Sequence, residues 1–257
     1  MEVCETQVDN QDTTPAPMKE DNIDDNSEGK TTFYVLVIIL EFLGLLCMVL
    51  VLVWTVKYLG GLEWDTTSTH LFNYHPLFMV LGLVVMFGNS AVIYRVLRFT
   101  NKFTVKIIHG VLHVAAFIFS VLGLYAVFTF HNNSNIPNMY SLHSWFGIGT
   151  VVLFSCQLVV GCLGFLYPKF NDENRRLYLK IHVYFGGIIL VLAVVSCISG
   201  ITEKMLFMKK VFNYSDFPAA ANVGNALGVC IGLFAMLVAY ILYNPSYKRV
   251  EKYQHLN

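Results

Sequence analysis

Charged residues are scarce in this chain of 257 residues. Asp, Glu, Lys and Arg together make up 13% of it, whereas hydrophobic residues make up 56%. A typical soluble domain carries about 25% charged residues, so the composition argues against one. The 17 basic and 17 acidic residues cancel to a net charge of zero. Without a basic field, the sequence gives no indication of nucleic-acid binding.

Short segments of alternating polarity, which would indicate a transmembrane β-barrel, are also lacking. The apolar residues form six long blocks, at about residues 33–56, 75–94, 107–128, 142–167, 181–201 and 220–243. About 20 apolar residues are enough to span a bilayer. In lipid, every backbone N–H and C=O needs a partner within its own segment, so we expect helices. The sequence therefore predicts an all-α membrane protein with six transmembrane helices.

The first thirty residues lack an apolar segment behind a basic start, so they do not read as a signal peptide. They contain nine acidic residues and two lysines, a composition typical of disordered segments. We therefore expect three parts. Residues 1–30 form an acidic cytosolic tail, residues 31–245 a six-helix membrane domain, and residues 246–257 a short basic cytosolic tail.

Lysine and arginine in the loops predict the orientation in the membrane. Basic residues gather after the second block, after the fourth block and in the C-terminal tail, which share one side of a six-helix protein. That side should be cytosolic, with both termini on it. The tripeptides Asn132-Asn133-Ser134 and Asn213-Tyr214-Ser215 are sequons for N-glycosylation. Both fall in loops on the opposite side, as this orientation requires.

The six cysteines show no disulfide or metal-binding framework. Five of them lie inside predicted spans and one in the N-terminal tail, namely Cys47, Cys156, Cys162, Cys197, Cys230 and Cys4. A cysteine inside an apolar segment usually behaves as a small hydrophobic residue. We expect neither a disulfide nor a thiolate metal site.

Five of the eight histidines lie in or at the ends of predicted spans. His75 and His143 begin the second and fourth spans from the outer side. His182 begins the fifth span from the cytosolic side, where the third span begins with both His109 and His113. A single histidine at such a place is more often an interfacial hydrogen-bonding residue. Imidazoles on four successive helices at two depths instead indicate function.

Paired histidines in a helical bundle suit one kind of cofactor. A zinc site uses three or four ligands, and neither level supplies them. A b-type haem needs two axial nitrogens, and bundle cores are common cofactor sites. With both axial positions filled, the iron has no place for substrate, which leaves electron transfer. Glycines near the histidines would leave room for the flat macrocycle: Gly82, Gly110, Gly147 and Gly186. A transporter or channel with a histidine proton relay is the alternative, and a non-enzymatic scaffold or haem sensor is a third reading.

The motifs FNYHPLFMVLG, VIYRVLR, KIIHGVLH, NMYSLHSW and IHVYFGG resemble those of the cytochrome b561 family in order and spacing. The resemblance covers roughly residues 33–243. Members are ascorbate-dependent transmembrane oxidoreductases with six helices and two haem b groups, so the resemblance implies a haem-binding core in helices two to five. It implies electron transfer from cytosolic ascorbate to an outer acceptor, either monodehydroascorbate radical or ferric iron or its chelate. Homodimers are usual in the family, and the loop charges suit a plasma, secretory-vesicle or endolysosomal membrane equally.

The family's pairing implies that His75 and His143 hold the outer haem, and that His109 and His182 hold the inner one. From the residues alone, His109 and His113 remain open, because positions i and i+4 share a helix face. The resemblance favours His109 and leaves His113 for a core contact or a haem propionate.

The resemblance also implies substrate sites at both surfaces. Ascorbate would be held on the cytosolic side by Arg95, Lys102, Lys106 and Arg175, although the loop-charge rule alone would place basic residues there. A cationic surface attracts an anion such as ascorbate. The outer acceptor site would comprise Phe128, His131, Asn138 and Tyr140. No catalytic residue is expected beyond the haems.

Overall fold

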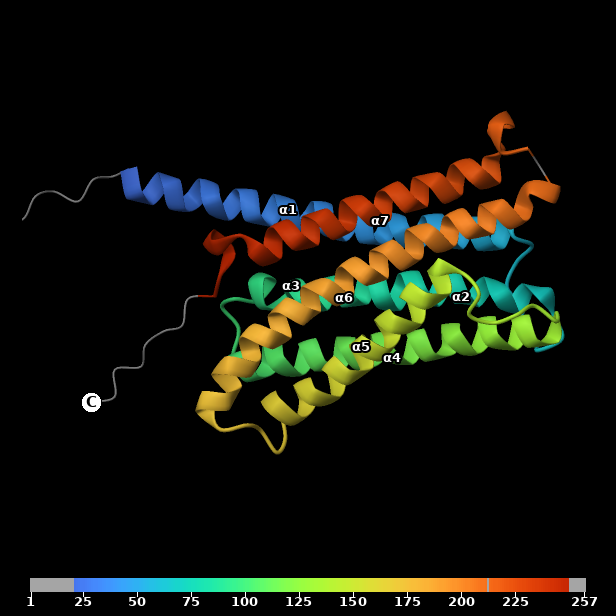
Figure 1. Cartoon of the computed structure of the whole chain (residues 1–257). Coiled ribbons are helices and arrows are strands. Elements are labelled where there is room, and N and C mark those ends of the chain that lie inside the picture. The colour runs from blue at the N-terminus through green and yellow to red at the C-terminus, as the bar shows by residue number, and fades with distance from the viewer. Residues whose placement is uncertain (1–20, 212, 250–257) are drawn as a thin grey trace, which may run out of the picture. The chain divides into compact units, whose positions relative to one another are not determined.

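The computed structural model describes residues 21–211 and 213–249, and these residues are helical apart from short connections (Figure 1). The chain divides into two units, Met1–Val35 and Leu36–Asn257. Helix α1 (Asp21–Val53) begins within the stretch expected to be a tail, so the described part of that stretch is helical. Residues 1–20 of the expected N-terminal tail lie outside the described residues, and the expected C-terminal tail is described only as far as residue 249.

The prediction of six membrane-spanning helices is confirmed. Six helices are long and apolar enough to cross a bilayer, namely Gly29–Tyr58, Thr69–Val96, Lys102–Asn133, Leu142–Phe165, Asp172–Phe207 and Ala219–Tyr243. The described residues contain no strand, so the all-α class is confirmed as well. Several helices extend beyond the apolar blocks, and the fifth runs well past the predicted limits of 181 and 201 at both ends.

The remaining helices follow α1 in chain order. The π-helical turn η1 (Trp54–Tyr58) completes the first span. The second span combines η2 (Thr69–Asn73), α2 (Tyr74–Met79), the π-helical η3 (Val80–Met86) and α3 (Phe87–Val96). The last four spans are α4 (Lys102–Asn133), α5 (Leu142–Phe165), α6 (Asp172–Phe207) and α7 (Ala219–Tyr243). Short 3-10 turns η4 (Met208–Lys210), η5 (Tyr214–Asp216) and η6 (Pro245–Tyr247) lie outside the spans.

Polar side chains fix where three of these spans begin. The side chains of Asn101, Ser141 and Asn171 accept hydrogen bonds from backbone N–H groups in the first turns of α4, α5 and α6. Such N-caps satisfy donors that have no partner within the helix. Ser141 and Ser144 form a reciprocal capping box. This box places His143 in the first turn of α5, just inside the apolar segment.

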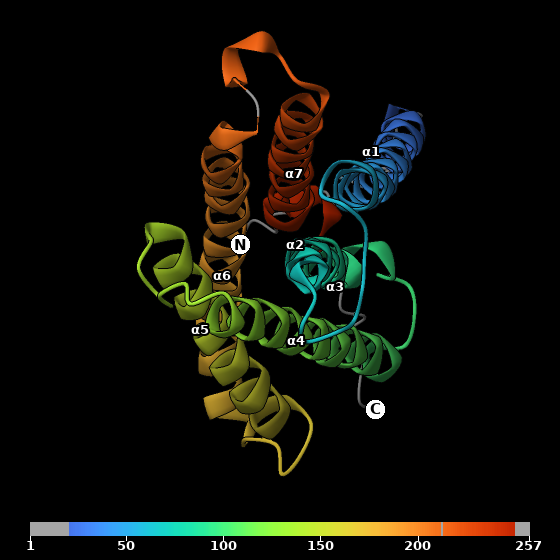
Figure 2. The same ribbon diagram turned by 90° about the vertical axis from the view of Figure 1, so that its right-hand side faces the viewer.

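Helix α4 packs against the second span, α5 packs against α6, and α7 packs against α6 and α3 (Figure 2). On α4, most of the buried residues are small, among them Ala116, Ser120 and Gly123, whereas Val111 and Ile118 are exposed. Small residues let membrane helices approach closely. The exposed apolar side chains are those expected to face lipid.

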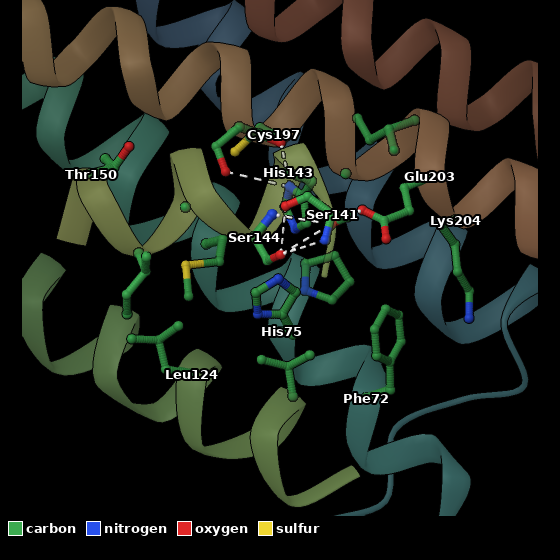
Figure 3. Close-up of a pocket in the computed structure, with 18 of the residues that line it drawn as sticks. Phe72, His75, Leu124, Ser141, His143, Ser144, Thr150, Cys197, Glu203 and Lys204 are labelled. Atoms are coloured by element: carbon green, nitrogen blue, oxygen red, sulfur yellow. Dashed lines mark hydrogen bonds between the residues drawn. The ribbon is translucent and has the colours of Figure 1, made fainter. Parts of the chain in front are cut away.

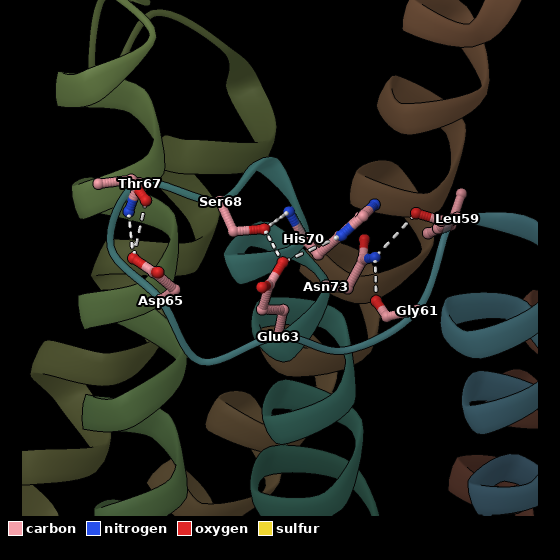
Figure 4. A network of polar contacts seen from close by, with 8 residues as sticks. All are labelled: Leu59, Gly61, Glu63, Asp65, Thr67, Ser68, His70 and Asn73. Carbon is pink, nitrogen blue, oxygen red and sulfur yellow. Dashed lines mark hydrogen bonds and ion pairs between the residues drawn. The ribbon is translucent and has the colours of Figure 1, made fainter.

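The ends of the spans define two ends of the bundle. The loops after Tyr58, Asn133 and Phe207 lie at what we call the Tyr140 end, and the loops after Val96 and Phe165 lie at the Arg95 end. The first loop of the Tyr140 end is folded by its own polar groups (Figure 4): the Asn73 side chain donates to the carbonyls of Leu59 and Gly61 at 2.9 and 2.6 Å.

Candidate functional site: two pairs of buried histidines

His75 of α2 and His143 of α5 enter one pocket at the Tyr140 end (Figure 3). Their ring centroids lie 6.0 Å apart, with an angle of 81° between the ring planes. The Nδ1 atom of His75 is 3.1 Å from the carbonyl oxygen of Gly123, and that of His143 is 2.8 Å from the carbonyl oxygen of Ser196. A carbonyl can only accept, so Nδ1 carries the proton in both rings. The Nε2 lone pairs are thereby left for a metal.

The second pair lies toward the Arg95 end. The rings of His109 on α4 and His182 on α6 have centroids 6.2 Å apart. His109 Nδ1 lies 2.9 Å from the carbonyl oxygen of Ser90 and 3.1 Å from its hydroxyl. The Nδ1 atom of His182 is buried without a hydrogen-bond partner among the described residues. The rings of Phe165 and Tyr178 pack around His182, at centroid distances of 5.2 and 5.8 Å.

His113 occupies a different position from its neighbour on α4. Its ring lies 4.5 Å from that of His109 and packs edge-on against Phe87 and at a tilt against Phe154, at 5.0 and 5.5 Å. Two phenyl rings thus surround His113, while His109 is the ring in contact with His182. His109 is thus the α4 histidine whose ring contact with His182 is resolved, at a centroid distance of 6.2 Å.

The donor set fits a haem iron better than an ion held by protein alone. In the described residues, no group of three or more His, Cys, Asp or Glu side chains could hold a metal. An imidazole–metal bond is about 2 Å long, so a metal between two Nε2 atoms places the ring centroids about 6 Å apart. Both pairs meet this distance. Two protein nitrogens are sufficient when a porphyrin supplies the other four.

Glycine at position 200 makes room for the His143 ring. A Cβ atom built on Gly200 would stand 2.6 Å from Cε1 and 2.8 Å from Nδ1 of His143. These distances are too short for any real carbon contact, so a larger residue would push the imidazole out of its place. Since Ser196 and Gly200 lie one turn apart on α6, this helix both orients the ring through a hydrogen bond and leaves space for it.

Polar groups from three segments gather at the mouth of the same pocket. Ser141 donates a hydrogen bond of 2.9 Å from Oγ to Oε2 of Glu203. The ammonium group of Lys204 lies 4.3 Å from the centre of the Phe72 ring, a cation–π contact. Partial burial, and after it the Glu203 carboxylate, raise the pKa of the Tyr140 phenol. The mouth therefore presents both signs of charge beside a neutral phenol.

The structure brings the four residues expected at the outer acceptor site together in the lining of this pocket: Phe128, His131, Asn138 and Tyr140. Sequence reasoning missed Glu203 and Lys204 as site residues. The sequence feature that could have indicated these residues is an acidic residue next to a basic one, two residues after the apolar run that ends at Ile201. A count of loop charges cannot show that the side chains of such a pair line a pocket.

Three of the four cations expected to hold ascorbate form one cluster at the Arg95 end. Lys102, Arg175 and also Lys169 lie close enough to Lys106 to repel its charge. Lys106 donates from Nζ to the carbonyl oxygen of Phe165 at 3.1 Å. Arg175 is partly neutralised by Asp172, with N–O 2.5 Å. Lys169 was not among the residues expected here.

The fourth cation, Arg95, is engaged elsewhere. Its guanidinium donates to the carbonyl of Leu242 in the last turn of α7. Cations near the last carbonyls of a helix stabilise its C-terminus. The contacts of Arg95 thus tie α3 to α7, and its other terminal nitrogen, Nη1, is buried without a partner in the described part of the chain.

A helical membrane bundle with two pairs of facing imidazoles has the architecture of a membrane-embedded cytochrome. The family model described as eukaryotic cytochrome b561 matches residues 74–208, a range that contains both histidine pairs. This chain belongs to the cytochrome b561 family, whose cofactor is haem b.

Three relatives illustrate the similarity. The chain is 44% identical over 230 residues to the lysosomal membrane ascorbate-dependent ferrireductase of Danio rerio. The matched segment covers 87% of this chain and 93% of the relative. It is 38% identical over 224 residues to the plasma membrane ascorbate-dependent reductase of Xenopus tropicalis, covering 86% and 79%. It is 40% identical over 209 residues to the transmembrane ascorbate-dependent reductase of Sus scrofa, covering 81% and 82%.

Replacing Gly200 by alanine tests the fit of the His143 ring. Gly200→Ala should lower the haem-to-protein ratio of the purified protein, because overpacking costs about 1–3 kcal/mol and moves a ligand. Haem extracted as its pyridine complex measures this ratio. The matched control is Gly149→Ala on α5, where an added Cβ meets nothing within 4 Å. An equal ratio in both variants would show that the ring at position 143 does not hold haem.

Proposed function

We propose that the protein transfers electrons across the membrane from cytosolic ascorbate to an acceptor on the opposite side. Two haem b groups would be held by His75 with His143 and by His109 with His182. The observation that carries the proposal is the pairing of imidazoles at two levels, with centroid distances of 6.0 and 6.2 Å. The relatives' names, which describe ascorbate-dependent reductases, support the donor. When bound, each haem supplies a reversible one-electron redox change.

Helix α4 sets the separation of the two levels. It carries His109 of the inner pair, and its Gly123 carbonyl orients His75 of the outer pair. These positions are 123 − 109 = 14 residues apart, which corresponds to roughly 21 Å along a helix. A single rigid helix thus fixes both levels, so neither pair can shift in depth without the other.

At the Arg95 end, which we propose faces the cytosol, the chain's role is to gather and orient the donor. Lys102, Lys106, Lys169 and Arg175 form a patch of like charge. Such a patch raises the local concentration of an anion and accelerates its arrival. Arg95 contributes its charge from the side of α7 and holds that helix end in place.

At the Tyr140 end, ferric iron is the acceptor that the pocket mouth suits best. Ferric iron is a hard cation, and carboxylate oxygen suits such ions. Glu203 supplies a carboxylate whose orientation is held by Ser141, and His131 and Asn138 line the same mouth. The first relatives found are named ferrireductases, which supports this substrate. Lys204 beside the pocket favours an anionic second acceptor, such as monodehydroascorbate.

The same reading extends to assembly and location. We propose that the protein lies in an endolysosomal or plasma membrane, since relatives named for each of these membranes share 38–44% of their residues with this chain. We also propose a homodimer, on the resemblance to the family alone. We further propose that the membrane domain extends from residue 31 to residue 245. A transporter that relays protons through its histidines gains no support from the relatives, which are named as reductases.

Alanine variants of the two neighbouring histidines on α4 test the inner pair. His109→Ala should remove one of two haems, halving the haem-to-protein ratio, and should abolish electron transfer across vesicle membranes. His113→Ala should retain both haems, because its ring packs between Phe87 and Phe154 rather than against His182. The reverse pattern, with haem lost only from the His113 variant, would refute the assigned pair.

A charge-removing variant tests the acceptor site. Glu203→Gln should lower ferric reduction about tenfold, because a charged contact of about 1.5–3 kcal/mol is lost. Reduction of the haems by ascorbate should be unchanged, since the donor cluster lies at the other end. Vesicles with ascorbate inside and ferric chelate outside measure the first rate, and haem absorbance measures the second.

Glu63→Gln is the matched control for this experiment. Glu63 lies at the same end of the bundle, but it bonds Ser68 and His70 within its own loop (Figure 4). Its loss should leave ferric reduction unchanged. Equal rates in both variants would exclude Glu203 from the acceptor site.

A further inference from the structure

The two N-glycosylation sequons of the chain lie in very different surroundings. Asn132 and Asn213 are their acceptor residues, and both are exposed at the Tyr140 end. Asn132 belongs to the last turn of α4, whereas Asn213 lies in the loop between α6 and α7. The function proposed above uses neither sequon.

Asn132 is held within folded structure. Its Oδ1 accepts a hydrogen bond of 2.8 Å from the Asn138 side chain, which lines the pocket mouth. Its backbone carbonyl accepts the N–H of Ser134, the third residue of the sequon. The middle residue, Asn133, donates its side-chain amide to the carbonyl of Thr66 at 2.6 Å. Every residue of this sequon is therefore part of a helix end or bonded to a neighbouring loop.

Asn213 is less constrained, although its carbonyl accepts the backbone N–H of Asp216 at 3.2 Å and the Tyr214 hydroxyl donates to Oδ1 of Asn225 at 2.6 Å. Its backbone is extended, with φ −82° and ψ 125°. Its amide nitrogen is 3.3 Å from Oδ1 of Asp216, at the long limit of a hydrogen bond between two exposed groups. Tyr214 and Ser215 are exposed as well, and Phe217 is 77% exposed. The acceptor nitrogen can turn away from Asp216 at little cost.

The two asparagines also differ in their distance from the apolar segments. Asn132 follows Phe130 by two residues, so it remains at the membrane boundary. Asn213 lies six residues beyond the end of α6 at Phe207 and six residues before α7 begins at Ala219. A transferase that works on surface segments can reach the second asparagine much more easily.

We propose that Asn213 carries an N-linked glycan and that Asn132 does not. The donor is an oligosaccharide carried on a lipid diphosphate. Nδ2 of Asn213 forms a bond to the anomeric carbon of the sugar, the bond from that carbon to the diphosphate oxygen breaks, and the amide proton leaves with the lipid diphosphate. This inference rests on the proposed orientation, in which the Tyr140 end faces the secretory lumen.

Mobility on a denaturing gel, with and without a peptide N-glycosidase, tests the inference in the full-length chain expressed in animal cells. The unmodified chain should shift by one glycan on digestion. Asn213→Gln should migrate at the digested position and show no further shift. Asn132→Gln should behave as the unmodified chain. A glycan that persists in Asn213→Gln, or no glycan on the unmodified chain, overturns the inference.

Glu173→Thr in the Asn213→Gln background supplies a matched control at the opposite end. It completes a sequon at Asn171, which, like Asn213, is an exposed residue that precedes a helix. Asn171 should stay unglycosylated, which supports the orientation on which the inference rests. A glycan on Asn171 shows that the membrane orientation is reversed and overturns the proposed direction of electron transfer. No glycan on the unmodified chain, together with an unglycosylated Asn171 in this variant, overturns the glycan alone.

Discussion

The hydrogen bond from a histidine Nδ1 to a backbone carbonyl is the constraint on which the rest of this structure depends. It occurs at His75, His143 and His109, each time to a carbonyl on a neighbouring helix. The bond fixes the tautomer and restrains the rotation of the ring, and it leaves Nε2 as the nitrogen free to bind a metal. The fourth imidazole, His182, has no such partner among the described residues, and the rings of Phe165 and Tyr178 pack around it instead.

This constraint explains why the helices around the histidines are rich in small residues. A carbonyl within a helix is already engaged with its own chain, and a side chain from another helix reaches it only if the two backbones come close. Gly123 on α4 and Ser196 on α6 allow that approach, and Gly200 leaves space for the ring beside it. The same small residues thus allow both the close packing of the helices and the orientation of the histidine rings.

The six spans and the positions of the histidines could be predicted from the sequence, because lipid demands long apolar helices and makes every imidazole within them conspicuous. The helical conformation of residues 21–30 could not, because an acidic composition does not show whether a helix continues past the apolar run. Glu203 was missed because its role depends on Ser141, sixty-two residues away in the chain. The resemblance to the family grouped Arg95 with the other cations of the ascorbate site, and a motif could not show that the guanidinium bonds the end of α7.

The number and ligation of haem irons in the unmodified protein test this account most directly. Quantitative iron and haem analysis per chain, combined with electron paramagnetic resonance of the oxidised protein, reports both at once. The account predicts two haem irons per chain, each low-spin, because two imidazoles fill the axial positions of each. A single haem per chain, or a high-spin iron with an open axial position, would contradict it.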